Sequence, residues 1–245
     1  MLIVPSGIPT SGGSGYTINN AVWFDGSADY LHWTPGGAPD STRIQAHSLW
    51  VKLGNFSIAQ QGIHRILDDQ MLTPLSNGTN DMYLAGTAGG RMTVSRVMRD
   101  PTGWMHFLQL FDTTQATAAN RWRIYMNGVR LTSAEFSTET QPALNYDLVY
   151  LLGNGRQQVF AASNAPGEFF TGHLAEIAAI DGTAYEATDF GEFDANNNWQ
   201  PIDISGLTFG TNGYHLDMAV APGTGSGAGT DVSGNANHFT EVSMT

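Results

Sequence analysis

The sequence predicts an all-β sandwich or barrel, and three observations support this. Twelve short segments rich in aliphatic and aromatic residues are separated by Gly, Pro, Asn, Asp and Ser. Glycine is abundant, with 29 of 245 residues, and charged residues make up only 13%, which suits a turn-rich β protein better than a helical one. Almost no segment has the apolar period of an amphipathic helix. With 41% hydrophobic residues the chain can bury the core of a single domain.

The chain divides into three predicted parts. Residues 1–20 hold two prolines and several glycines and serines, which indicates an extended N-terminal arm. Residues 21–218 form the predicted sandwich, and residues 219–245 a Gly/Ser/Thr-rich C-terminal tail that we expect to be flexible and that Phe239 can anchor. One short helix is expected over 183–190. Strands are expected over 21–26, 29–33, 48–54, 64–69, 81–87, 91–98, 104–112, 121–128, 129–131, 147–153, 173–182 and 214–218.

Two strands give further detail. Between 104 and 112 both alternating sets of side chains are largely apolar, so this strand should lie centrally in a sheet that is covered on both faces. Between 121 and 126 the set Trp122, Ile124 and Met126 alternates with polar residues and predicts a single buried face. Asn127-Gly128 follows, and this pair supplies the positive φ angles of a type I′ hairpin turn.

The charge distribution argues against a nucleic-acid ligand. The net charge is −12, and all ten Lys and Arg residues lie at or before Arg156, where eleven acids face them. From residue 157 onward eleven acids face no Lys or Arg. Such a field repels phosphate backbones, so we expect no nucleic-acid partner. The simplest role of this acidic surface is to keep the protein soluble. A more specific role would be to bind a basic partner or calcium.

Several classes of site and location are not expected. There is no cysteine, which excludes disulfides and thiolate metal sites. The seven histidines show no zinc-ligand spacing, and we expect no cofactor. No apolar run is long enough for a membrane helix, and the opening residues lack the features of a signal peptide. We therefore expect synthesis in a cytoplasm and no membrane insertion.

The strand sequences resemble a known superfamily. AVWFDGSADYL, SLWVKLG, FLQLFD leading to RWRIYMNGVRL, and GHLAEIAAIDG together resemble concanavalin A-like lectins and glucanases in their laminin-G-like form. The resemblance covers roughly residues 20 to 190, and its most specific parts are the R-x-Y-x-N-G hairpin and the G-x-L-A-E-I strand. It implies a jelly-roll sandwich of two antiparallel sheets.

The segment after residue 189 resembles an extension that accompanies this fold in tailed-bacteriophage virion proteins. The resemblance rests on DFGEFDANNNWQP, GTNGYHLDM and TDVSGNANHFT. It implies a non-enzymatic head decoration, head fibre or tail component, made in the host bacterial cytoplasm and located in the virion. Other virion proteins and further copies of the chain are the implied partners, with a host-surface glycan as candidate ligand.

The resemblance to this superfamily raises two possible chemistries, glycoside hydrolysis and calcium binding. Its glucanases carry Glu-x-Asp-x-Glu or Glu-x-Asp-x-x-Glu on one strand face. Here the Glu-x-Asp is Glu192-Phe193-Asp194, with no second glutamate following it, so we expect no enzyme activity. Calcium in laminin-G-like domains is held at a rim by aspartates and carbonyls. The candidates here, at strand ends or turns, are Asp81, Asp112, Asp181 and Asp231.

Sugar binding calls for aromatic rings that stack on pyranoses and for flat polar groups that bond to hydroxyls. Candidates with polar or turn-like neighbours, or on the outward face of the 121–126 strand, are Tyr30, Trp33, Tyr83, Arg121, Arg123, Tyr125 and Trp199. Glu176 shares the nominal strand face of Leu174 and Ala178, so a buried partner is expected, with arginine the first candidate.

Two alternatives to the virion protein remain open at the level of sequence. One is a free-standing carbohydrate-binding lectin. The other is a polysaccharide depolymerase with a carboxylate pair that the motif does not reveal.

Overall fold

The computed structural model describes residues 15–54, 61–66, 69–74, 81–85, 89–97, 102–149, 151–162 and 168–244. Side chains of 69–74, 81–85 and 96–97 lie outside this description, as do residues 1–14, which include the apolar part of the predicted arm. The described residues contain strands and 3₁₀ turns but no α-helix. None of their helices is long or apolar enough to span a membrane.

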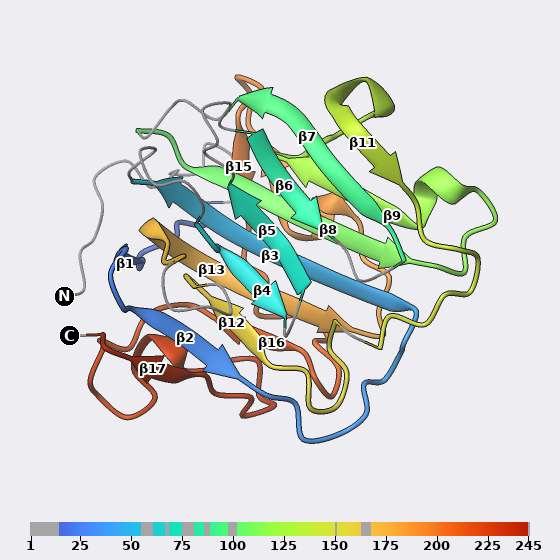
Figure 1. Ribbon diagram of the computed structural model, residues 1–245. Coiled ribbons are helices and arrows are strands. Elements are labelled where there is room, and N and C mark those ends of the chain that lie inside the picture. Colours follow the sequence, from blue (N-terminus) through green and yellow to red (C-terminus); the bar gives the residue numbers. More distant parts are fainter. Residues whose placement is uncertain are drawn as a thin grey trace.

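Two antiparallel sheets stack face to face, and Figure 1 shows the eight-stranded sheet in front of the seven-stranded one. The seven-stranded sheet runs β1 (Val22–Asp25), β13 (Thr171–Asp181), β3 (Ile44–Leu53), β8 (Met105–Asp112), β9 (Trp122–Met126) and β10 (Val129–Arg130), with β16 (Tyr214–Leu216) also paired to β13. The eight-stranded sheet runs β11 (Phe136–Thr140), β7 (Arg91–Val97), β6 (Asp81–Ala85), β5 (Asp69–Pro74), β4 (His64–Ile66), β12 (Gln158–Phe160), β2 (Tyr30–Trp33) and β17 (Thr240–Val242). The expected all-β sandwich of two antiparallel sheets is confirmed.

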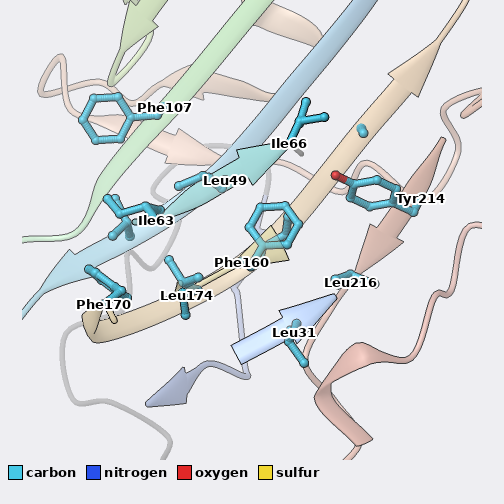
Figure 2. Close-up of a cluster of buried hydrophobic side chains, with 14 of the residues drawn as sticks. Leu31, Leu49, Ile63, Ile66, Phe107, Phe160, Phe170, Leu174, Tyr214 and Leu216 are labelled. Atoms are coloured by element: carbon cyan, nitrogen blue, oxygen red, sulfur yellow. The ribbon is translucent and has the colours of Figure 1, made fainter. Parts of the chain in front are cut away.

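The main core fills the space between the two sheets. Figure 2 shows Leu49 and Phe107 of the seven-stranded sheet among side chains that include Ile66 and Phe160 of the other sheet. Trp122, Ile124 and Met126 point into the same core, as the alternation of β9 predicts, and each is at most 7% exposed.

A third layer covers the outer face of the seven-stranded sheet. The hairpin β14 (Gly191–Phe193) and β15 (Trp199–Pro201) belongs to it, and Figure 1 shows β15 behind the sheets. Together with the sheet it encloses a second apolar cluster, whose members include Ala46, Trp50, Leu108, Tyr125, Ala178, Ile180, Phe190, Trp199, Ile204 and Phe209. The central strand β8 is therefore buried on both faces, as predicted from its sequence.

Two expectations about local structure are wrong. The described part of 147–153 is a series of turns, in which the N–H of Leu151 bonds to the carbonyl of Leu148. Its leucines are buried all the same, because a loop can fill a core as well as a strand can. The expected helix over 183–190 is only the 3₁₀ turn η3 (Ala187–Asp189), and Glu186 caps it.

The C-terminal residues pack against the sandwich. Strand β17 adds to the edge of the eight-stranded sheet beside β2, and Phe239 is 1% exposed within the main core. The carboxylate of Glu241 accepts the N–H groups of Gly223 and Ala228 and so ties down the Gly-rich loop that precedes it. Phe239 anchors this segment as expected, while the division of the chain at residues 20 and 218 stays a prediction.

The N-terminal segment reaches the covered face of the seven-stranded sheet. Ile18 is 1% exposed in the outer cluster, and the hydroxyl of Tyr16 donates to Glu176 Oε1 at 2.7 Å. The second oxygen of Glu176 lies 2.6 Å from His215 Nε2. The expected arginine partner for Glu176 is therefore wrong, because a β-bulge between Ala175 and Ala178 turns its side chain toward β16.

Candidate functional site

A surface depression of about 330 Å³ opens between the β9–β10 turn, the β14–β15 hairpin and the residues that precede β8. It combines apolar rings with amide groups. Its lining residues are Trp50, Trp104, Asn127, Val129, Phe193, Asn197, Asn198 and Trp199.

The β9–β10 turn forms one wall. Asn127 and Gly128 have φ angles of 46° and 72°, which are the positive values expected for this Asn-Gly pair. The side-chain oxygen of Asn127 accepts the main-chain N–H of His106 at 2.7 Å, so the turn is tied to β8. A Cβ atom at Gly128 would overlap the indole of Trp199, and only glycine leaves room for that ring.

Trp199 forms the floor and is fixed by a buried hydrogen-bond chain. Its Nε1–H donates to His106 Nδ1 at 3.0 Å, so the proton on that imidazole lies on Nε2, which is 2.9 Å from Ser48 Oγ. Burial lowers the pKa of His106 to about 3, and the ring is neutral at pH 7. The Trp50 ring packs on the same imidazole with centroids 5.0 Å apart. This Ser-His pair is a packed, hydrogen-bonded element of the floor.

The loop of the β14–β15 hairpin forms the opposite wall. Asp194 Oδ1 accepts the main-chain N–H groups of Asn196 and Asn198, both at 2.8 Å, and these bonds lower the pKa of Asp194. Asn197 takes the left-handed conformation with φ 62°. The Asn198 side-chain amide also donates to Asp194 Oδ2 at 3.2 Å. The loop therefore presents the amide of Asn197 and the side-chain oxygen of Asn198 at the rim, while its aspartate is occupied internally.

The exposed surface of the depression is apolar beside amides. Phe193 is 44% exposed and Val129 is 51% exposed, although both side chains are large and hydrophobic. Asn amides supply both donors and acceptors. Such a surface can stack against the apolar face of a sugar ring and bond to its hydroxyls. Neither Glu192 nor Asp194 lines it, so the Glu-x-Asp sequence places no carboxylate pair here.

The predicted sugar-binding residues do not form one site. Of those whose side chains are described, Trp199 lines the depression and the others lie elsewhere. Tyr30 and Trp33 are on β2 of the other sheet, where Trp33 packs edge-on against Tyr214. Tyr83 lies in β6, and its side chain is outside the described residues.

The remaining three predicted residues stand on β9 or immediately before it. Arg121 donates to three main-chain carbonyls at 2.8 to 3.0 Å and so braces a loop. Tyr125 is 8% exposed under the third layer. Arg123 lies 2.5 Å from Glu186 and lines a second crevice of about 270 Å³ together with Arg130 and Glu139.

The calcium candidates have internal partners where they are described. Asp112 accepts bonds from Thr114 and Gln115. Asp181 accepts the N–H groups of Asp40, Ser41 and Asn212. Asp231 accepts those of His215, Ser233 and Asn237, while the side chain of Asp81 lies outside the described residues. The described residues contain no group of three His, Asp or Glu side chains that could hold a metal.

Sequence reasoning missed most of the depression. Trp50, Trp104 and Phe193 resemble ordinary core residues, and the walls come together from segments some 70 residues apart. The usable signal was FDANNNW, an exposed turn of consecutive amides flanked by aromatic residues.

No protein-family model and no curated protein sequence matches the chain. Solved structures do match. A Bacteroides ovatus protein, provisionally described as carbohydrate-binding, superposes with a TM-score of 0.55 and 13% identity, over 91% of this chain and 60% of its own. Domain 4 of an extracellular arabinanase from Geobacillus stearothermophilus, solved with arabinotriose, superposes with a TM-score of 0.43 and 18% identity, over 75% of this chain and 79% of its own. A heptameric pentraxin from Limulus polyphemus superposes with a TM-score of 0.42 and 11% identity, over 68% of this chain and 77% of its own.

At this level of identity the match to the Bacteroides protein shows the fold alone, a sandwich of two antiparallel sheets. The chain spans 60% of the length of that protein, so no function transfers with the fold.

Proposed function

We propose that the chain is a non-enzymatic carbohydrate-binding module that holds a glycan in the depression between the β9–β10 turn and the β14–β15 hairpin. The observation that carries this is the exposure of Phe193 and Val129, 44% and 51%, beside three asparagine amides. The two side chains line the same depression, and exposed apolar surface gathered in one place is typical of binding sites. The lectin-like fold supports the proposal by analogy.

The test is affinity electrophoresis of the full chain through gels that contain neutral or acidic polysaccharides. Binding should retard the wild type, and Phe193→Ala should remove most of the retardation because it deletes the exposed ring. Asn197→Gly should weaken binding while it preserves the left-handed backbone of the loop. Leu144→Ala removes a side chain of similar exposure (50%) that does not line the depression, and it should behave like wild type. Equal retardation of Phe193→Ala and wild type would overturn the site.

Catalysis is a separate question. A depolymerase would release reducing ends from the polysaccharides that retard the protein, whereas a binding module leaves them intact. Release that persists in a Glu192→Gln and Asp194→Asn double variant would point to another carboxylate pair, and release of any kind would contradict the non-enzymatic reading.

The virion role rests on the sequence resemblance alone, and none of the three structures named above is described as a virion protein. Association with a phage particle, and with further copies of this chain, stays a prediction. Gold-labelled antibody on intact particles tests it. Label on the head or the tail would support the virion protein, and particles without label would favour a free lectin.

A further inference from the structure

Beyond the depression, four side chains form a row across one face of the seven-stranded sheet. Trp23 of β1 pairs in register with His173 of β13, and His173 pairs with Lys52 of β3. Met105 pairs with Val51, so Trp104 before it continues the row. Neighbouring strands lie about 4.8 Å apart, and four positions therefore span roughly 14 Å.

The row is continuous in space and joins the depression. The Trp23 and His173 rings have centroids 4.8 Å apart, and those of His173 and Trp104 are 6.1 Å apart. Trp104 also lines the depression. Trp23 is 37% exposed, and the other three side chains are partly exposed. A row of rings thus leads from the depression, which Phe193 also lines, to the edge strand β1.

Lys52 gives this row a positive charge. Its ammonium group offers three hydrogen-bond donors and no acceptor. Lys52 takes no part in the ion pairs of Arg43 with Asp147 and of Arg123 with Glu186, or in the contact of His215 with Glu176. Asp25 lies two residues from Trp23 on β1, but its Oδ1 accepts the N–H and the hydroxyl of Ser27, both at 2.7 Å.

We propose that the glycan site extends along Trp104, Lys52, His173 and Trp23 and takes an acidic polysaccharide chain, whose carboxylate or sulfate groups Lys52 binds. This inference rests on the proposed carbohydrate-binding function. The tryptophans stack on successive sugar rings, and the lysine selects rings that carry an acid. Partial burial and the charge of Lys52 lower the pKa of His173, so this imidazole adds little positive charge to the row at pH 7.

The net charge of −12 does not oppose this locally. At physiological salt, charges more than about 8 Å away are largely screened, so acidic residues in distant parts of the chain act only weakly on the row.

The experiment compares acidic polysaccharides with their neutral methyl esters by affinity electrophoresis at 0.15 M salt. The first pair is polygalacturonate and fully methylated pectin, and the second is hyaluronate and its methyl ester. At least one acidic form should bind more tightly than its ester. Lys52→Gln should weaken binding to the acidic form by about two- to fivefold and leave binding to the ester unchanged. Trp23→Ala should weaken binding to long chains of both forms by about tenfold.

Arg43→Gln is the matched control, because it removes the same charge just before β3, at the end opposite Lys52, and should leave binding unchanged. If acid and ester bind wild type equally, or if Lys52→Gln acts on both alike, the extended acidic site is overturned while the depression stands. If the Phe193 variant and wild type behave alike with every polymer, or if none binds, the proposed function fails with it.

Discussion

The carboxylate of Glu176 lies 2.6 Å from the imidazole of His215, and both side chains are buried. Glu176 has a φ of 43° within the bulge of β13, a conformation that few non-glycine residues adopt. The pair, with the Tyr16 hydroxyl, connects the N-terminal segment, β13 and β16.

Removing the charge of Glu176 should destabilise the fold. Glu176→Gln replaces the charged acceptor of two hydrogen bonds, from Tyr16 and His215, by a neutral amide, and it is expected to cost about 2 kcal/mol of unfolding free energy. Tyr16→Phe removes one hydrogen bond to a carboxylate from a partly exposed position and should cost about 1 kcal/mol. Urea denaturation measures both, and a Glu176→Gln protein as stable as wild type would show that the pair contributes nothing.

Stability should fall as the pH drops from about 6.5 to 4.5. Burial lowers the pKa of His64 to about 4 and that of His106 to about 3, against 6.5 in the unfolded chain, and it lowers the pKa of His47 as well. In this range the unfolded chain takes up protons that the folded protein does not, so each histidine contributes a loss of up to about 1.4 kcal/mol per pH unit.

Urea midpoints at pH 7, 6 and 5 test this dependence. His64→Asn, which removes one titrating ring, should flatten it by up to about 1.4 kcal/mol per pH unit relative to wild type, whatever its effect on absolute stability. An identical slope in the variant would show that His64 is protonated in the folded state.

Gly128→Ala should disturb the depression as well as the turn. The new Cβ would overlap the Trp199 ring, and a φ of 72° is strained for alanine. We expect a loss of about 1 to 2 kcal/mol and a shift in tryptophan fluorescence. Gly36→Ala is the control, since no atom lies within 4 Å of its Cβ position. It should change neither the stability nor the tryptophan fluorescence. An unshifted spectrum in Gly128→Ala would contradict the packing of Trp199 on this turn.

Trp199→Phe isolates the hydrogen bond to His106. Phenylalanine keeps much of the apolar bulk but leaves the Nδ1 acceptor of His106 without its 3.0 Å donor. An unpaired buried acceptor costs about 1 to 3 kcal/mol, which thermal or urea unfolding can measure. In the NMR spectrum of the variant the His106 ring should change tautomer or gain mobility. No loss of stability would mean that packing alone holds the hairpin.

Phe239→Ala tests whether residues 219–244 belong to the cooperative unit. Phe239 is 1% exposed and packs against Trp33, Phe160 and Tyr214, so truncation should cost about 3 to 5 kcal/mol. Val232→Ala, at a side chain that is 47% exposed, is the control with little expected effect. A small loss for Phe239→Ala would show that this segment docks only weakly on the sandwich.

The sequence by itself determined the fold class and most of its strands. Alternation in β9 and the double apolar pattern of β8 report which faces are buried, because side chains in a strand alternate with period two. The Asn127-Gly128 turn could also be predicted, since few other residue pairs tolerate two positive φ angles. These features depend on residues that are neighbours in the chain.

The tertiary structure alone decided the site. The walls of the depression and the row from Trp104 to Trp23 come from strands far apart in sequence, and strand order and register bring them side by side. The bulge at Glu176 changes which face its side chain occupies, and nothing local in the sequence marks it. The third layer buries Tyr125 on the face of β9 that its sequence indicates to be open. The alternation of apolar and polar residues in a strand shows that a side chain points away from one core. Only long-range packing decides whether that side chain is then buried in a second core or exposed to solvent.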